Sequence, residues 1–255
     1  MTPENTGSPG VFFFRGQPPP STKPYFYTKN THAIFTSMNT PTLQTIFDNM
    51  TPDSIARYTD YWQSIKPETN DEIFRRWLFA YTSIHTNWEG NVRGYNAIKD
   101  FGKWIFDKEN LRTLLMEARC GMHNVRTDYI WDFAKDFFAN TSDFLKSDDE
   151  SWTAMRDRLT NRLRGIGVTK VSFTMEMCFP NDAKVVCLDT HMMQLYGMDV
   201  VRNDGKHKKI YEANEQDWID RSSNVESAPY ITRCLFWDKK QGHEDSRYWS
   251  HVLEA

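Results

Sequence analysis

The sequence predicts an all-α protein made of two helical lobes that exchange chain segments. Two observations carry this prediction. Apolar residues recur at helical spacings of three and four through most of the chain, whereas alternating strand patterns are few and we find no internal repeat. The 255 residues are also enough to bury a substantial hydrophobic core.

Composition and charge exclude several classes of protein. A chain with 15% aromatic residues is not disordered overall. No apolar run approaches the roughly 18 to 20 residues that span a bilayer, so we expect no membrane-spanning segment and no membrane partner. The net charge of −3, from 31 Lys and Arg against 34 Asp and Glu, gives no support to non-specific coating of nucleic acid. A local basic face could still bind nucleic acid, because the distribution of charge and not its sum sets the local field.

The first residues and the cysteines point to an intracellular protein. The opening MTPENTGSPG lacks the basic and apolar regions of a secretory signal. The four cysteines form no CxxC motif and no metal-ligand spacing; they are Cys120, Cys178, Cys187 and Cys234. We therefore expect reduced thiols, no metal site and a cytoplasmic location, which would be the host cytoplasm for a viral protein.

Residues 1–30 are expected to form an extended arm ahead of a helical body over 31–255. Pro18, Pro19 and Pro20 cannot lie together inside a helix. The arm also carries aromatic residues, namely Phe12, Phe13, Phe14, Tyr25, Phe26 and Tyr27. So many aromatic side chains indicate that the arm packs on the body, which we favour, or on a partner.

Capping and spacing signals place the helices of the body in order. Thr40-Pro41 and Thr51-Pro52 each put an N-cap residue before a proline, which is typical of a helix start. From 71 to 85, apolar residues recur with the spacing of a half-buried helix. Further helices are expected over 91–106, 111–118, 125–138, 152–164, 169–178 and 188–196, and again after 209.

Glycines and polar runs separate these helices. Gly121, Gly165 with Gly167, and Gly197 interrupt the apolar pattern. The polar stretch 140–150 is expected to be a loop that ends in a cap at Ser147 or Ser151, 180–184 a turn, and 202–209 (RNDGKHKK) a basic loop.

The stretch 163–197, LRGIGVTKVSFTMEMCFPNDAKVVCLDTHMMQLYG, is the most informative. Gly165 and Gly167 allow a tight turn between two helices with a bare backbone. The second helix then points its free N–H groups outward, which suits a phosphate group.

A lysine and an aspartate follow this turn. Lys170 lies just inside the second helix, and Asp189 comes 19 residues later at the start of another. An amine and a carboxylate that meet across a cleft can act as nucleophile and electrostatic partner. The apolar stretch 171–179 would place the lysine near a dry interior and lower its pKa. Taken singly, Asp189 also fits an N-cap and Lys170 a surface lysine.

These residues resemble those of the helix-hairpin-helix DNA glycosylase superfamily. A helix, a GxG hairpin, a lysine soon after it and Leu-Asp-Thr-His about 19 residues on are similar to the family signature over about 35 residues. The resemblance implies an all-α fold with a cleft between two lobes and a helix-hairpin-helix at about 152–179. It also implies an enzyme that binds duplex DNA and flips a modified base into the cleft.

The resemblance assigns roles residue by residue. The hairpin would bind a DNA phosphate through backbone N–H groups and hold a monovalent cation, with no other cofactor required; its residues are Gly165, Gly167, Val168 and Thr169. Lys170 would attack C1′ of the sugar, giving a Schiff base and then strand cleavage. Asp189 would stabilise the charge that develops on the sugar.

Two upstream segments are similar to the DNA-facing turns of the family, those at 81–90 and 118–129. The residues expected to wedge the duplex or contact the orphaned base are His85, Thr86, Asn87, Asn124 and Arg126. In the basic run, Lys206 and Lys208 are expected either to contact phosphates or to be solvated.

The sequence also departs from the family pattern. Arg164 replaces the usual hairpin proline, and one extra residue separates Gly167 from Lys170, which could rotate the lysine by about 100°. No four-cysteine iron–sulfur loop follows.

Three functions therefore stay open. The first is a DNA glycosylase with lyase activity. The second is an amino acid:DNA transferase, similar to phage enzymes that build hypermodified thymines. Such an enzyme would replace the phosphate of a flipped 5-phosphomethyl-uracil with a free amino acid such as glycine. The third is a non-catalytic DNA-binding module. In each case we expect a monomer.

Overall fold

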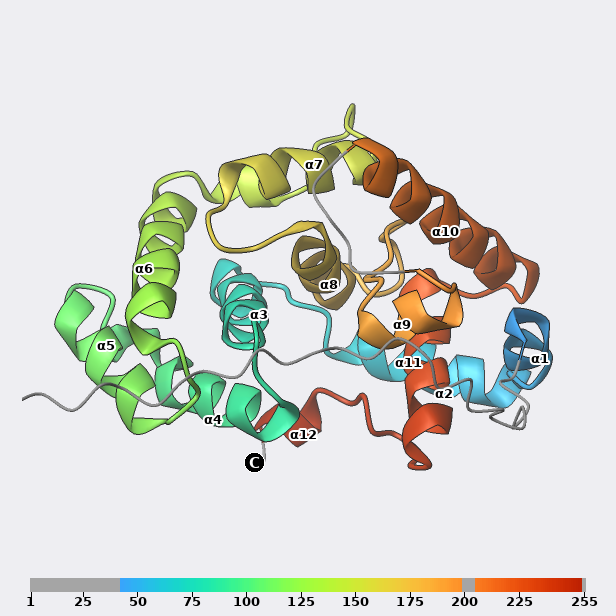
Figure 1. Cartoon of the computed structure of the whole chain (residues 1–255), viewed down its shortest axis with the longest axis horizontal. Coiled ribbons are helices and arrows are strands. Elements are labelled where there is room, and N and C mark those ends of the chain that lie inside the picture. The colour runs from blue at the N-terminus through green and yellow to red at the C-terminus, as the bar shows by residue number, and fades with distance from the viewer. Residues whose placement is uncertain (1–41, 199–204, 254–255) are drawn as a thin grey trace, which may run out of the picture. The chain divides into compact units, whose positions relative to one another are not determined.

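The computed structural model describes residues 42–198 and 205–253, all within the unit Pro41–Ala255 (Figure 1). The predicted arm and the Thr40-Pro41 helix start lie outside the described residues. The described part of the chain contains helices and no strand, so the all-α prediction is confirmed.

Short and medium-length helices follow one another along the described ranges. In chain order they are α1 (Leu43–Asp48), α2 (Pro52–Ser64), α3 (Asn70–Thr82), α4 (Trp88–Ile98), η1 (Phe101–Lys103), α5 (Lys108–Glu117), α6 (His123–Ala139), η2 (Thr141–Phe144), α7 (Trp152–Arg162), α8 (Val168–Cys178), α9 (Thr190–Leu195), α10 (Gly205–Asn224), α11 (Pro229–Gln241) and α12 (Ser250–Leu253).

Side-chain caps fix several helix starts where the sequence predicts them. Thr51 and Ser54 form a reciprocal capping box at α2, and Thr69 and Glu72 form one at α3. Ser151, one of the two predicted caps, accepts a hydrogen bond from a backbone N–H of the first turn of α7 at 3.1 Å. These local signals make the starts of α2, α3 and α7 readable from the chain alone.

Two segments differ from the prediction. The helix expected over 91–106 ends at Ile98, because the Trp104 indole Nε1 turns back and donates to the Ile98 carbonyl at 2.8 Å. The basic run expected as a loop is helical from Gly205, and Lys208 forms ion pairs with Glu212 on the same helix and Asp157 on α7.

Two hydrophobic clusters make up the core. The larger one joins α2 to α8 with parts of α11 and α12, and the smaller one joins α1, α9, α10 and α11. Helices α3 and α8 pack against each other within the larger cluster (Figure 1). Helix α11 faces both clusters, with Ile231 in the larger and Phe236 in the smaller. Helix α11 therefore connects the two clusters.

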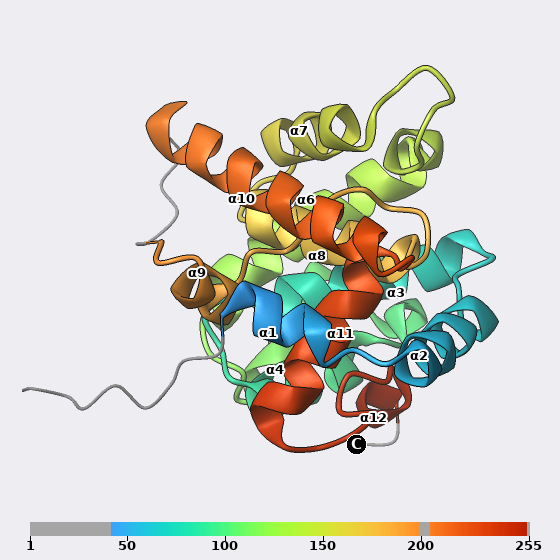
Figure 2. The ribbon, with the colours of Figure 1, turned by 90° about the vertical axis from the view of Figure 1, so that its right-hand side faces the viewer.

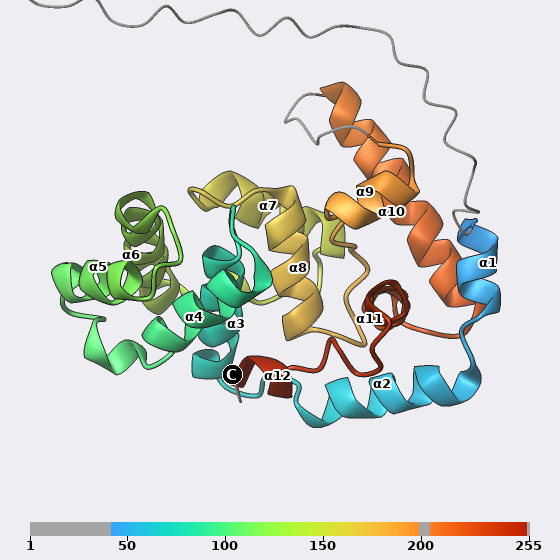
Figure 3. The same cartoon turned by 60° about the horizontal axis from the view of Figure 1, so that its bottom comes forward.

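The C-terminal helices close the core from two sides. Helix α10 runs beside α11 (Figure 2). Helix α12 lies close to α3 (Figure 3), where the Arg76 guanidinium carbon is 3.9 Å from the ring centroid of Trp249.

The described ranges carry neither a candidate membrane span nor a candidate metal cluster. None of the helices there has the length and apolar character that crossing a membrane requires. Within those same ranges, no group of three or more His, Cys, Asp or Glu side chains is placed to hold a metal ion. All four cysteines are buried and free.

Candidate active site

A cavity of about 390 Å³ brings together the two residues on which the predicted chemistry depends. Lys170 comes from the first turn of α8, and Asp189 lies directly before α9. Other walls come from the end of α3, the start of α4 and from α11. The extra residue after Gly167 therefore leaves the lysine facing the same cavity as the carboxylate.

The surroundings of Lys170 favour its neutral form. Burial lowers the pKa of Lys170 below its ordinary value. The nearby guanidinium groups of Arg233 and Arg247 lower this pKa further, while the Asp189 carboxylate raises it. Only a neutral amine is nucleophilic, so the lowered pKa suits a lysine that attacks carbon.

Asp189 is held by contacts to both of its oxygens. Its Oδ1 accepts hydrogen bonds from the backbone N–H groups of His191 at 3.0 Å and Met192 at 3.1 Å, which caps α9. Its Oδ2 accepts from the Trp237 indole at 3.1 Å and lies 3.6 Å from Nη1 of Arg233. The carboxylate is thus both a helix cap and a fixed negative charge in the cavity.

Arg233 connects this carboxylate to a second, fully buried one. Its Nε and Nη2 donate to the two carboxylate oxygens of Glu176 at 2.9 and 2.5 Å. The backbone N–H of Cys187 donates to the same carboxylate at 3.1 Å. Burial raises the pKa of Glu176 to about 7, against the opposing effect of Arg233. The pair ties α8 and α11 to the segment that carries Asp189.

Sequence analysis missed Glu176, Arg233 and Arg247. Glu176 carried a usable signal, because a lone carboxylate inside the apolar stretch 171–179 must find a partner when it is buried. The two arginines carried none, since they lie far along the chain in segments without a motif.

The hairpin before α8 depends on glycine. Gly165 has a φ of +76°, and a Cβ at this position would lie 2.0 Å from the ring of Tyr129. Gly167 is the N-cap of α8 and offers no side-chain cap. Arg164, which stands where the family has proline, pairs with Asp132 on α6 at 2.6 Å.

The start of α8 leaves two N–H groups without an intrahelical acceptor. The first donors to the helix ladder are the N–H groups of Lys170 and Val171, both to the Gly167 carbonyl. The N–H groups of Val168 and Thr169 precede them at the open end of the helix. Phosphate binding at this hairpin stays a prediction, and so does the binding of a monovalent cation there.

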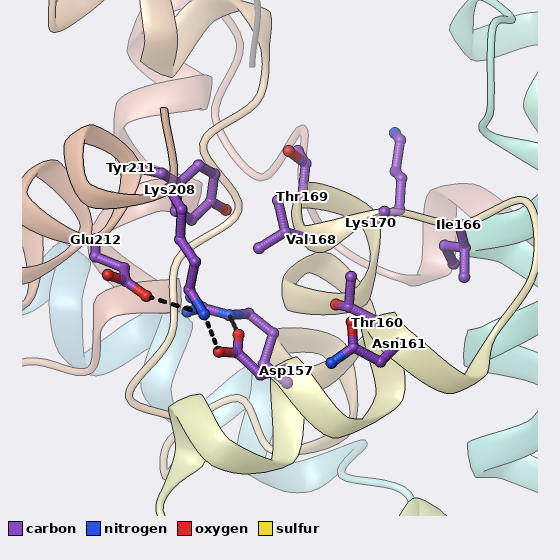
Figure 4. Close-up of a pocket in the computed structure, with 12 residues that line it drawn as sticks. Asp157, Thr160, Asn161, Ile166, Val168, Thr169, Lys170, Lys208, Tyr211 and Glu212 are labelled. Atoms are coloured by element: carbon purple, nitrogen blue, oxygen red, sulfur yellow. Dashed lines mark hydrogen bonds and ion pairs between the residues drawn. The ribbon is translucent and has the colours of Figure 1, made fainter. Parts of the chain in front are cut away.

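A second cavity of about 360 Å³ lies on the other side of the hairpin, among α7, α8 and α10 (Figure 4). Lys208 lines it and pairs with Asp157 at 2.6 Å and with Glu212 at 3.6 Å. The hydrogen bond to Asp157 raises the pKa of Lys208. Figure 4 shows the Lys170 side chain pointing away from Asp157 and Asn161. Lys170 lines this cavity as well as the first one. The side chain of Lys206 lies outside the described part.

Two of the five predicted wedge residues belong to the wall of the first cavity. Thr86 and Asn87 line it, and Asn87 caps α4 by accepting from the Gly90 N–H at 2.9 Å. His85 is exposed and has a left-handed backbone, with a φ of +49°. Insertion of these residues into a duplex stays a prediction.

The second predicted DNA-facing turn requires a correction. Arg126 is only 3% exposed, and its guanidinium donates to the carbonyls of Tyr81, Thr82 and Ile84 at the end of α3. Its burial does not fit the predicted contact with DNA, and its role is to satisfy helix-terminal carbonyls. Asn124 is exposed, as a DNA contact requires, and accepts from Arg112 Nε at 2.7 Å.

Three solved structures of DNA glycosylases have a similar arrangement of helices. The 8-oxoguanine DNA glycosylase of Methanocaldococcus jannaschii is 21% identical, with a TM-score of 0.62 over 78% of this chain and 93% of that chain. The 8-oxoguanine glycosylase/lyase of the same organism, in complex with a 15mer DNA that contains 8-oxoguanine, has a TM-score of 0.62 at 20% identity, over 78% and 95%. The 8-oxoguanine DNA glycosylase of Thermotoga maritima has a TM-score of 0.62 at 17% identity, over 78% and 96%.

These similarities establish the fold. The chain has the two-lobed helical fold of the helix-hairpin-helix DNA glycosylases, as the resemblance predicted. No family model matches the sequence, and no curated protein matches it either.

Proposed function

We propose that this protein is a DNA glycosylase with lyase activity that acts on a modified base flipped out of duplex DNA. The observation that carries the proposal is the shared cavity of Lys170 and Asp189, in which burial lowers the pKa of the amine and four contacts fix the carboxylate. The fold, which is that of glycosylases solved alone and with DNA, supports it.

The chemistry can be written with these two residues. The lone pair of the neutral Lys170 amine forms a bond to C1′ while the glycosidic bond breaks and its electron pair leaves with the base. The new ammonium group loses a proton, and the departing base gains one. The sugar ring then opens to a Schiff base, whose C2′ proton is lost as the C3′–O bond breaks. Asp189 stabilises positive charge that develops on the sugar before the bond to nitrogen is complete.

Trapping with borohydride tests the proposal. Duplexes that carry oxidised purines, 5-hydroxymethyl-uracil or 5-phosphomethyl-uracil are incubated with the protein and sodium borohydride. We expect one duplex to give a covalent protein–DNA adduct and a free base. Lys170→Gln should abolish the adduct but retain duplex binding, whereas Lys184→Gln, which changes a lysine that does not line the cavity, should behave as wild type.

The transferase remains the alternative, although the glycosylase structures give it no specific support. Mass spectrometry of the same duplexes with and without free glycine separates the two. Conversion of phosphomethyl to aminoacyl-methyl uracil, only when glycine is present, would refute excision. Tight duplex binding without either product would leave the non-catalytic module.

A further inference from the structure

Arg247 is a cation in the active-site cavity that the proposed chemistry does not use. It lies between α11 and α12, and its guanidinium carbon is 4.0 Å from the ring centroid of Trp237 and 5.8 Å from that of Trp88. Two aromatic faces therefore hold the group in place. In the described part of the chain no carboxylate pairs with Arg247, and its buried Nε has no hydrogen-bond partner there.

The other charges of the cavity are already matched. Arg233 is bound by both oxygens of Glu176. The Asp189 carboxylate is occupied by its cap hydrogen bonds, the Trp237 indole and Arg233. If Lys170 is neutral when it attacks, Arg247 is the cation that remains without a counter-charge. A half-buried guanidinium without a counter-charge can bind an anion through paired N–H donors.

An unpaired acceptor lies in the same cavity. Asn91 on α4 is 4% exposed, and its Oδ1 has no hydrogen-bond partner among the described residues. A bound ligand must therefore satisfy two groups of opposite character: it offers a negative charge to Arg247 and a donor to Asn91. A nucleobase with ring N–H groups and an acidic substituent has this combination.

We propose that the cavity selects a nucleobase that carries an anionic substituent, a carboxylate or a phosphate, and that Arg247 is the residue that binds it. Asn91 accepts a hydrogen bond from the same base. This inference rests on the proposed function in one respect, which is that the ligand enters as a flipped base. The competing source of an anion is a phosphate of the DNA backbone.

Pairs of bases with the same shape and different charge isolate the effect of the anion. Duplexes of one sequence carry 5-carboxyuracil or its neutral isostere 5-carbamoyluracil, and a second set carries 5-phosphomethyl- or 5-hydroxymethyl-uracil. A 2′-fluoro-arabino sugar at that position blocks turnover, so that Kd is measured on the unaltered protein. We expect at least one anionic base to bind about tenfold more tightly than its neutral counterpart, the size of one charge-assisted contact.

Arg247→Met should reduce this preference to within about twofold, and Arg247→Lys should retain part of it. The matched control is Lys135→Met, which removes an exposed cation that lies 5.0 Å from the Trp131 ring and outside the cavity. It should keep the full preference. A thermal melt of each variant shows whether it is folded. If Arg247→Met does not fold, the test uses Arg247→Lys in its place.

Two results would overturn the proposal. In one, wild type prefers neither anionic base. In the other, Arg247→Met weakens the binding of every duplex equally, unmodified DNA included. The slope of log affinity against log salt concentration then also falls by about one, which indicates a contact with a backbone phosphate. If wild type binds no duplex, the proposed function fails, and the same ligand pairs are titrated as free nucleosides. If wild type binds the anionic nucleoside more tightly than the neutral one and Arg247→Met does not, the anion site is supported. If wild type shows no such preference, the anion site is refuted.

Discussion

The two oxygens of Asp189 have separate partners, and this division explains how one residue fits two sequence interpretations. Oδ1 caps α9, while Oδ2 faces the Trp237 indole and Arg233. The cap positions the carboxylate at the start of a helix that the fold needs in any case. Capping and charge are therefore supplied by the same backbone placement rather than by competing ones.

At Lys170, the lowered pKa has a measurable consequence. The amine must be neutral to attack, so the single-turnover rate should rise with pH and level off once the amine has lost its proton. Because burial lowers this pKa, the plateau should begin below the ordinary lysine value of about 10.4. Rates of borohydride-trapped adduct formation from pH 5 to 10 check this. A rate that still rises in proportion to hydroxide at pH 10 would contradict it.

Asp189→Asn separates the two jobs of the aspartate. Asparagine caps helices about as well as aspartate, so the start of α9 should be kept. The amide nitrogen that replaces Oδ2 cannot accept from the Trp237 indole or pair with Arg233, so the free energy of unfolding should fall by about 1 to 3 kcal/mol. The lost negative charge removes an effect that raises the pKa of Lys170. The rate plateau should therefore move to lower pH, while its height falls by about 10²-fold because charge on the sugar is no longer stabilised. Urea unfolding and the same pH series measure both; an unshifted profile would show that Asp189 does not act on Lys170.

At the scale of elements, the hairpin between α7 and α8 was predictable because its signals are local. Two glycines, a following helix and a lysine within six residues are visible in one stretch of sequence. The environment of the lysine was not. Arg233 lies 57 residues after Glu176, and nothing near either residue in the sequence specifies that they pair. Arg126 was misassigned for the same reason, since only the fold brings it under the carbonyls at the end of α3.

Gly165 and Gly121 form a matched pair for the hairpin. Both have a φ of +76°, but a Cβ would meet the Tyr129 ring only at Gly165 and nothing within 4 Å at Gly121. Gly121→Ala should cost about 1 to 2 kcal/mol through backbone strain alone. Gly165→Ala should cost clearly more, because the ring must also move, and should weaken binding of DNA. Urea unfolding of both variants tests this; equal losses would mean that the Tyr129 contact is easily relieved.

Arg126 gives a second test at this scale. Arg126→Met leaves the carbonyls of Tyr81, Thr82 and Ile84 without their charged donor, so we expect a loss of about 2 to 4 kcal/mol. Asn124→Ala, two residues away on the surface, should cost less than about 0.5 kcal/mol. If Arg126→Met instead leaves stability intact and weakens DNA binding, the original prediction of a DNA contact is restored.

For the whole molecule, the two hydrophobic clusters are joined by buried polar links as well as by α11. Arg156 on α7 donates to both oxygens of Glu215 on α10, and Glu215 also accepts from the Val186 N–H at 2.8 Å. One carboxylate thus connects α7, α10 and the segment that leads to Asp189. Sequence patterns indicated two lobes, but they could not show this link, because charged residues at 156 and 215 look like ordinary surface positions of two helices.

Breaking that link should test how far the lobes depend on each other. Glu215→Leu removes the buried carboxylate of the pair and leaves the Arg156 guanidinium with only the partly exposed Asp157, 3.3 Å from its Nε, which should cost about 3 to 5 kcal/mol. Arg156→Met should cost a similar amount, because the buried Glu215 carboxylate then loses its cation. The double variant removes both charges at once, so its loss should be well below the sum of the single losses. Urea unfolding of the four proteins measures this coupling. Additive losses would show that the pair contributes through packing alone, and a transition that splits into two steps would show that the clusters unfold separately once the link is gone.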